Sequence, residues 1–259
     1  MRERSAIKAL LMPEEKITYT LPIDKGDNAL IISPHPDDEA LGCGGAIIKM
    51  LSSEVNITVT ILTDGNGGGK LKDISRIRKE EFMKARSVLG YSTFSILDYP
   101  DGQLAPYQEE LSEQIRRILF KKVPKLVLTP YLLDHATDHQ TANISLAQAL
   151  RDITKINIVV GMYEIWTPIP NPNCFLNITE EYPQKRMAME CYQSQEEYFG
   201  IIDKADALST FRARLSMRRR VEYMECFKLI STKEYIDMVE LWKNCQCQAE
   251  GGEIEHAIY

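Results

Sequence analysis

The sequence predicts an α/β protein with a mostly parallel sheet and helices on both of its faces. Over the first two-thirds of the 259 residues, short apolar runs rich in β-branched residues alternate with longer amphipathic segments. Such alternation is typical of β-α-β units, which build parallel sheets. Because neither an internal repeat nor a convincing linker interrupts the chain, we predict one domain over residues 1–259.

Each expected element follows from its local pattern. Continuous apolar runs predict buried strands at 29–33, 55–62, 95–97, 125–129 and 156–160. Helical periodicity predicts helices at 41–51, 74–89, 109–120 and 141–150, and Gly90 is a usual stop signal after the second of them. From about residue 168 the chain becomes irregular and then helical, with helices expected at 185–199 and 203–227.

Composition narrows the class of protein. The net charge of −6 argues against a nucleic-acid partner. We interpret Arg218-Arg219-Arg220, the densest basic run, as a solvated helix face. No apolar stretch approaches the roughly 20 residues that span a bilayer, and residues 9–12 are too short for a signal-peptide core. We therefore expect no membrane anchor. The six cysteines show no C-x-x-C spacing, which argues against a disulfide framework, so we expect a reducing cytoplasm.

The strongest chemical signal follows the first expected strand. There the chain reads Pro34-His35-Pro36-Asp37-Asp38-Glu39. In open parallel sheets, ligands bind just beyond the carboxyl ends of the strands. Three adjacent carboxylates repel one another unless a cation neutralises them, and catalytic zinc accepts imidazole and carboxylate ligands. A helix cap is the simpler alternative, but it needs one carboxylate rather than three.

A further metal ligand is expected from another strand end. The strand 125–129 leads into residues 130–139, which contain His135 in the loop and His139 at the start of the next helix. Two histidines in a strand-end loop that faces the acidic motif favour a shared site. His256 in the polar tail lacks such a context, and Cys245-Gln-Cys247 without a partner pair is a weak metal signal.

Two glycine-rich segments lie near this motif. Gly42-Cys43-Gly44-Gly45 follows a strand and enters a helix but does not match the G-x-G-x-x-G fingerprint of dinucleotide sites. Close packing of helix against sheet explains these glycines better. Residues 64–70 form a loop that we expect to border the site. Both a closing loop and a plain surface loop remain open interpretations.

With His-Pro-Asp-Asp-Glu followed by Ala-Leu-Gly-Cys-Gly-Gly, the sequence resembles the LmbE-like/PIG-L superfamily of zinc-dependent N-deacetylases. The resemblance continues through Thr63-Asp-Gly65, Arg78-x-x-Glu81 with Ala85 and Leu89-Gly90, Tyr99-Pro-Asp101-Gly102, Tyr163-Glu164-x-Trp166, Lys185, Ser194-Gln195 and Tyr223-x-Glu225-x-Phe227.

The resemblance implies a Rossmann-like fold and one zinc ion per chain, held by His35, Asp38 and His139. It also implies that Asp37 is the general base and that Arg78 and Asp101 hold sugar hydroxyls. The implied substrate is a small amino-sugar conjugate that loses its N-acetyl group, and Glu39 is expected to support the metal ligands.

One position departs from the family pattern, which is commonly His-x-Asp-His. The residue three before His139 is Ala136, and a histidine stands one place earlier, at His135. We expect His135 to take over the catalytic role of the missing histidine. Two alternatives stay open: a zinc hydrolase acting on a non-sugar amide conjugate, and a non-catalytic sugar-binding module that has kept the fold.

Overall fold

The computed structural model describes residues 17–153, 157–216 and 218–251, the last five of them by backbone alone. Residues 2–12, Ile156 at the start of an expected strand, the Cys247 side chain and His256 lie outside what is described. Within the described residues, seven strands form one sheet in the order β3-β2-β1-β4-β5-β7-β6. The first five of these neighbours pair in parallel, and β7 runs antiparallel to both β5 and β6. The mostly parallel sheet predicted from the sequence is therefore confirmed.

The strands have the following bounds: β1 Asn28–Ser33, β2 Asn56–Thr63, β3 Thr93–Tyr99, β4 Leu126–Pro130, β5 Val159–Tyr163, β6 Cys174–Asn177 and β7 Met224–Ser231. The helices are α2 Asp38–Ser52, α3 Ile74–Leu89, α4 Gln108–Lys122, α5 Thr137–Leu150, α6 Tyr182–Met189, α7 Gln193–Phe199, α8 Ile201–Leu215 and α9 Thr232–Gly251. A 3₁₀ turn, η1, spans Ala105–Tyr107.

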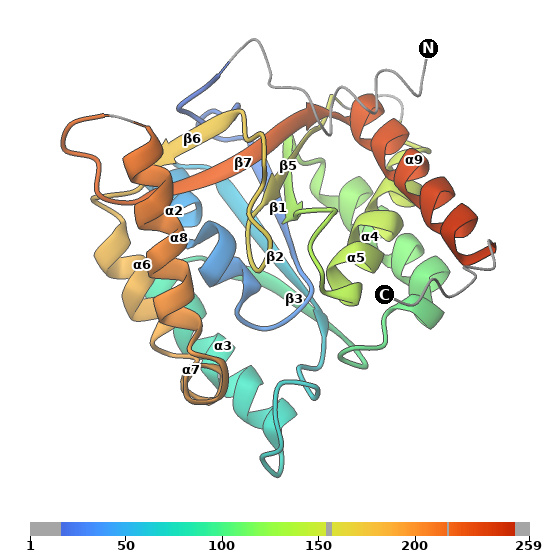
Figure 1. The fold of residues 1–259 in the computed structure, drawn as a ribbon, viewed down its shortest axis with the longest axis horizontal. Coiled ribbons are helices and arrows are strands. Elements are labelled where there is room, and N and C mark those ends of the chain that lie inside the picture. The colour runs from blue at the N-terminus through green and yellow to red at the C-terminus, as the bar shows by residue number, and fades with distance from the viewer. Residues whose placement is uncertain (1–16, 154–156, 217, 252–259) are drawn as a thin grey trace, which may run out of the picture.

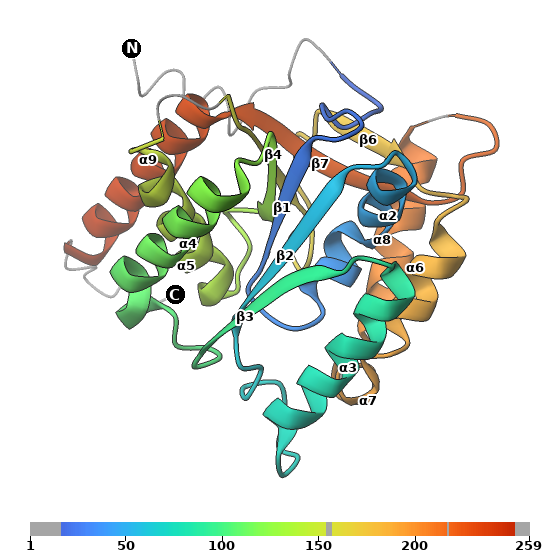
Figure 2. The ribbon, with the colours of Figure 1, turned by 180° about the vertical axis from the view of Figure 1, so that it is seen from behind.

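Two helical layers sandwich the sheet. Helices α2, α3, α6 and α8 lie on one side of the sheet, and α4, α5 and α9 lie on the other (Figure 1). The view from behind shows the same division, with β1 in the middle of the sheet (Figure 2). Alternate residues of β1 pack into two hydrophobic cores. Ala29 and Ile31 belong to one of them, and Leu30 and Ile32 belong to the other. Helices on both faces are thus confirmed.

Most of the expected elements have the right type, and α3 has the predicted bounds of 74–89. Its C-cap Gly90 has φ 94°, the left-handed conformation that glycine adopts without strain. Helices α2 and α5 begin three and four residues before their predicted starts of 41 and 141, so Asp38 and Glu39 lie in the first turn of α2 rather than before it. His139 lies in the first turn of α5, as expected.

Other expectations were wrong. The strand expected at 156–160 lies at Val159–Tyr163, and the helix expected at 185–199 is divided into α6 and α7. The helix expected at 203–227 ends at Leu215, because residues 224–231 form β7 in the interior of the sheet. Arg218-Arg219-Arg220 is exposed as expected but lies in a turn, not on a helix.

The strand order reverses between β1 and β4. From β1 the chain moves outward through β2 and β3 and then returns to add β4 on the other side of β1. At such a switch point the loops after the two strands diverge and leave a crevice, which is where ligands bind in open α/β sheets. His35 follows β1 and His139 follows β4, so both expected sources of metal ligands lie at this crevice.

Candidate metal centre and substrate cavity

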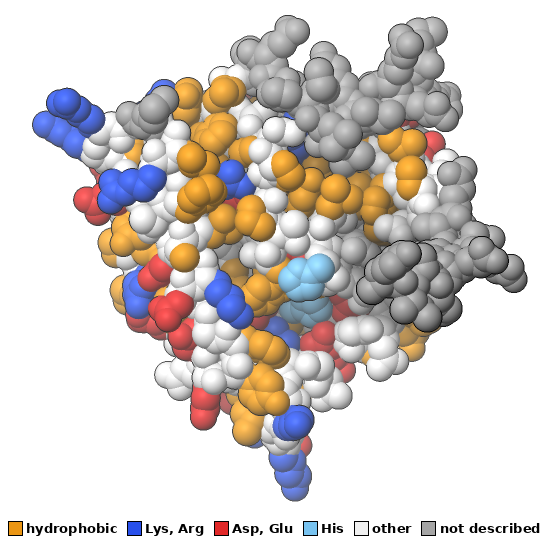
Figure 3. All heavy atoms as spheres, viewed as in Figure 1, with side chains coloured by type: hydrophobic (Ala, Val, Ile, Leu, Met, Phe, Trp, Pro, Cys, Tyr) orange, Lys and Arg blue, Asp and Glu red, His pale blue; other side chains and the backbone are white. Residues whose placement is uncertain are grey.

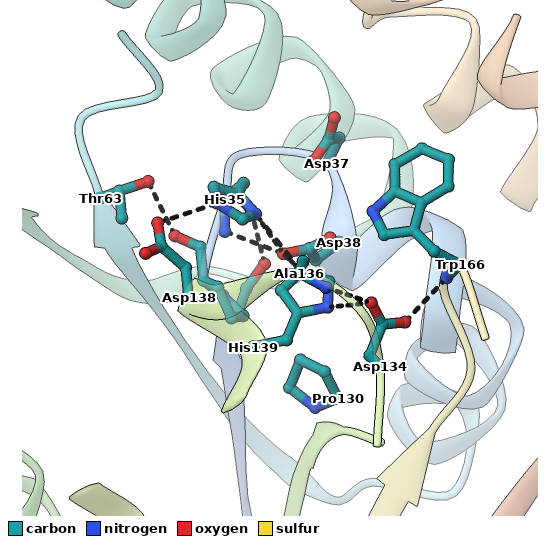
Figure 4. Close-up of polar contacts among 12 residues, drawn as sticks. His35, Asp37, Asp38, Thr63, Pro130, Asp134, Ala136, Asp138, His139 and Trp166 are labelled. Atoms are coloured by element: carbon teal, nitrogen blue, oxygen red, sulfur yellow. Dashed lines mark hydrogen bonds and ion pairs between the residues drawn. The ribbon is translucent and has the colours of Figure 1, made fainter. Parts of the chain in front are cut away.

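Three side chains from the two strand ends converge on one point. His35 Nδ1 lies 3.2 Å from Asp38 Oδ2, His139 Nε2 lies 3.2 Å from the same oxygen, and the two nitrogens are 3.3 Å apart. Asp38 and His139 are buried, and His35 is largely so. Figure 4 shows the rings of both histidines and the Asp38 carboxylate turned toward one another. The structure therefore brings together the three residues for which the sequence suggested a metal role.

These distances fit the ligand spacing of a tetrahedrally coordinated zinc ion. Ligand atoms about 2.0–2.1 Å from zinc at tetrahedral angles lie about 3.3–3.4 Å from one another, which leaves the fourth position open for water. The three donor atoms are therefore close enough together to hold a metal ion. Burial raises the pKa of Asp38, but the charges of His139 and His35 outweigh it and hold that pKa well below its usual value.

Asp134 orients one of the histidines, a role that no local sequence pattern indicated. Its Oδ1 lies 3.4 Å from His139 Nδ1, on the side of the ring away from Asp38 (Figure 4). The same carboxylate is fully buried and accepts hydrogen bonds from the backbone N–H groups of Ala136, Trp166 and Thr167. A carboxylate behind a metal-binding histidine fixes the tautomer that presents the other nitrogen to the metal.

Asp138 has a comparable place beside His35. Its Oδ2 lies 3.2 Å from His35 Nε2, and Asp101 Oδ1 lies at the same distance from that nitrogen. These three side chains form a second group with metal-binding spacing. However, both oxygens of Asp138 accept backbone hydrogen bonds, from Gly102 at 2.7 Å and Leu104 at 3.1 Å. We therefore interpret Asp138 as a carboxylate that orients His35 rather than as a ligand.

Asp37 lies next to His35, Asp38 and His139, called the metal trio below, but its carboxylate contacts Arg78 instead. It precedes α2 with φ 136°, a conformation rare for a residue with a Cβ, and its carbonyl accepts the N–H groups of Ala40 and Leu41. Its carboxylate lines the cavity and lies 3.1 Å from Arg78 Nη2. Burial and the charge of Asp38 raise the pKa of Asp37 to about 7, although Arg78 opposes the shift.

Glu39 supports the acidic motif from beneath. It is buried and accepts a hydrogen bond of 2.5 Å from the Tyr192 hydroxyl. Its other oxygen accepts hydrogen bonds from Ser33 Oγ and from the backbone N–H of Asp37. Burial raises the pKa of Glu39 to about 7. Because Glu39 holds the Asp37 backbone, it contributes to the strained turn from which Asp37 and Asp38 project.

Arg78 and Asp101 form one wall of the candidate site. Arg78 Nη1 donates to Asp101 Oδ2 at 3.2 Å, and its Nη2 donates to the carbonyl of Pro36 at 2.9 Å. The glycine loop packs against this pair, since Gly67 N–H donates to Asp101 at 3.0 Å. A Cβ on Gly68 would lie 2.3 Å from Arg78 Nη1, so only glycine permits this approach. The loop therefore borders the site, as expected.

A cavity of about 330 Å³ opens above the trio. His35 and Asp38 line it together with Asp37 and Asp101, and the more exposed residues His135, Trp166, Phe199 and Lys204 line its mouth. The His135 side chain is 73% exposed, with its ring centroid 6.5 Å from that of Trp166. Figure 3 shows histidine side chains among acidic and basic ones near the middle of this face. His135 is thus placed at the cavity but held by few contacts.

The site and the fold together define a class: an α/β protein with a His-Asp-His group that could hold a metal ion at the switch point of its sheet. Residues 30–150 match the family model described as PIG-L, GlcNAc-PI de-N-acetylase. This part of the chain holds every candidate site residue, so the resemblance to the PIG-L (LmbE-like) family seen in the sequence is confirmed there.

Several proteins that are similar to this chain are named as deacetylases. The chain is 28% identical to diacetylchitobiose deacetylase from Thermococcus kodakarensis, over 67% of this chain and 72% of that protein. N,N'-diacetylchitobiose deacetylase from Pyrococcus horikoshii has the same fold, with a TM-score of 0.72, 23% identity and coverage of 90% of this chain and 94% of that one.

A relative with another activity is equally similar in sequence. The chain is 29% identical to 4-oxalmesaconate hydratase from Pseudomonas putida, over 66% of this chain and 76% of that protein. Hydration is therefore a second activity named among proteins similar to this chain.

Proposed function

We propose that this chain is a zinc-dependent N-deacetylase that hydrolyses the N-acetyl group of an N-acetylglucosamine-type sugar or conjugate. The observation that carries the proposal is the His35-Asp38-His139 group, whose donor atoms lie 3.2–3.3 Å apart at the base of a cavity. The deacetylase names of the curated relatives support the same reaction class. One zinc ion per chain fits these donors, which are two imidazole nitrogens and one carboxylate oxygen.

A zinc ion held by His35, Asp38 and His139 would lower the pKa of a water molecule toward about 7 and would polarise the amide carbonyl. The Asp37 carboxylate then accepts the proton of the attacking water and returns it to the departing amine. Its place at the cavity wall, one residue from Asp38, suits that role. Arg78 restrains the carboxylate through the 3.1 Å contact and keeps it from binding the metal itself.

His135 would assist at the acetyl carbonyl. Its imidazole reaches the cavity from the loop before α5, one position before the place where the family commonly has histidine. When protonated, it would donate a hydrogen bond to the oxyanion that forms as the amide is attacked. Because its side chain is 73% exposed, we propose that bound substrate fixes its position.

The cavity walls suggest how a sugar would bind. Asp101 and the Gly67-Gly68 backbone lie on one wall, where we propose that they and Arg78 hold sugar hydroxyls. The volume of about 330 Å³ lies in the range of small-ligand sites and accommodates one N-acetylated sugar ring. The rest of a conjugate would pass the mouth, where Lys204 Nζ lies 5.2 Å from the Trp166 ring centroid.

Wider properties complete the proposal. We propose a single LmbE-like domain over residues 1–259, a cytoplasmic location and small-molecule partners rather than nucleic acid. No helix in the described part of the chain is long and apolar enough to cross a membrane.

The proposal is tested with purified protein loaded with zinc, cobalt or no metal. Acetate release is measured from N-acetylglucosamine, diacetylchitobiose and N-acetylglucosaminyl conjugates, and water addition is measured on an unsaturated dicarboxylate. We expect metal-dependent acetate release. Bound metal with acetate release only from non-sugar amides would favour another amide substrate. Hydration without acetate release would favour the hydratase activity, and failure to bind metal would leave a sugar-binding module.

A further inference from the structure

Helix α2, which begins with the metal-site residue Asp38, is broken at Cys43. This residue has φ −145° and ψ 23°, well outside helical values. In a continuous α-helix the Gly45 N–H would donate to the carbonyl of Leu41, four residues earlier. The break separates these two groups, so each needs another partner.

A buried ion pair takes the place of that helical hydrogen bond. Lys185 Nζ donates to the Leu41 carbonyl at 2.7 Å, and Glu225 Oε1 accepts the Gly45 N–H at 2.8 Å. Lys185 Nζ also contacts Glu225 Oε1 at 2.7 Å, and Glu225 Oε2 accepts the N–H of Ala46 at 2.8 Å. Lys185 from α6 and Glu225 from β7 are therefore inserted between the two halves of α2.

The glycine run makes room for this arrangement. A Cβ on Gly44 would lie 3.1 Å from Lys185 Cγ, and a Cβ on Gly45 would lie 2.6 Å from the Ile178 side chain. Lys185 is 2% exposed and Glu225 is 4% exposed. Burying two charges costs free energy that their attraction often fails to recover, so such a pair is poor evidence of a purely stabilising role.

We propose that the Lys185–Glu225 ion pair is a positioning device for the metal centre, an inference that rests on the proposed metal-dependent function. The first part of α2 is one turn long, from Asp38 to the break, and starts at the strained residue Asp37. Lys185 holds the far end of that turn at Leu41, three residues after Asp38. Without the pair, Leu41 and Gly45 can pair with each other, the helix straightens, and the Asp38 carboxylate turns away from His139.

The test uses the full-length protein loaded with cobalt(II), whose visible spectrum reports ligand geometry. In Glu225→Gln we expect cobalt(II) to bind at least about tenfold more weakly, as is typical when groups that orient ligands are altered. We also expect a changed visible spectrum. At saturating metal, kcat should fall by a larger factor than KM changes. The matched control is Glu164→Gln, which alters an equally buried pair with Arg212 that bonds the Ile169 backbone rather than α2. We expect this control to keep the cobalt affinity and spectrum.

A second variant covers the case in which Glu225→Gln does not fold. Lys185→Met with Glu225→Met removes both charges at similar volume, a change that buried pairs often tolerate. We expect its crystal structure to show α2 continuous through Cys43, and its cobalt affinity to remain low. A break that persists, or cobalt affinity and spectrum equal to those of the parent protein, would overturn the proposal. If the parent protein binds no cobalt, the proposed metal function fails, while the helix geometry of the double variant still decides the positioning inference.

Discussion

Replacing Asp134 with Asn isolates the contribution of a carboxylate that touches neither substrate nor metal. Asp134 contacts His139 Nδ1 at 3.4 Å and accepts three backbone N–H groups. Asparagine keeps the shape but replaces one accepting oxygen with an N–H₂ group, which cannot accept a hydrogen bond. In either amide orientation, at least two N–H donors then face another donor.

The effect on the metal follows from the tautomer of His139. We expect Asp134, 3.4 Å from Nδ1, to keep the ring proton on that nitrogen, so that Nε2, 3.2 Å from Asp38 Oδ2, can bind the metal. Once the amide N–H₂ group faces Nδ1, the proton moves to Nε2 and competes with the metal. We expect zinc to bind about 10–100-fold more weakly. That range corresponds to about 1.4–2.7 kcal/mol. Orphaned buried donors lower the free energy of unfolding by a further 1–3 kcal/mol, roughly.

The assay is competition with a fluorescent chelator for zinc, combined with urea unfolding of the metal-free protein. The matched control is Glu81→Gln, which alters another buried carboxylate that accepts a backbone N–H, that of Ser194, away from the trio. The control should lose stability but keep zinc affinity. Zinc affinity of Asp134→Asn within twofold of the parent protein would refute the assigned role of Asp134.

Three further substitutions test other parts of the site. Asp37→Ala should lower kcat by about 10²–10⁴-fold while zinc stays stoichiometric. Loss of zinc from Asp37→Ala but not from Asp38→Ala would reverse the assignment of Asp37 as general base and Asp38 as metal ligand. His135→Ala should lower kcat by up to about 100-fold with little change in KM, and adding Ala136→His should restore activity; an unchanged rate would remove His135 from the mechanism. Gly45→Ala should destabilise the protein by about 1–3 kcal/mol in thermal unfolding, because its Cβ would lie 2.6 Å from Ile178; an unchanged melting temperature would contradict the close packing.

The sequence predicted the parallel part of the sheet because its strands are continuous apolar runs. It failed at β7, which lies between β5 and β6 yet contains the buried charges Glu225 and Lys228. Because of those charges, the sequence pattern of this segment resembles that of an amphipathic helix. The β5 strand was placed too early because the apolar run was ended before Gly161, which lies inside β5, where its missing side chain admits Leu128, 2.7 Å from where a Cβ would lie.

The convergence of His35, Asp38 and His139 could be predicted because these residues belong to dense local motifs at strand ends. Asp134 and Asp138 could not, because their importance arises from contacts with His139 and His35 that form only after folding. The pairing of Arg78 with Asp37 was likewise hidden, since 41 residues separate the two. Roles that depend on a neighbour's ring or charge have no local pattern in the chain.

The reversal of strand order between β1 and β4 also affects how the chain acquires its metal. The two histidines of the trio are 104 positions apart and meet only when β4 has joined β1. A nascent or truncated chain that lacks β4 would offer the ion two ligands rather than three. Metal at 100 times its dissociation constant stabilises a folded protein by about 2.7 kcal/mol if the unfolded chain does not bind it. Uptake of the ion would then select chains whose central strands have already paired.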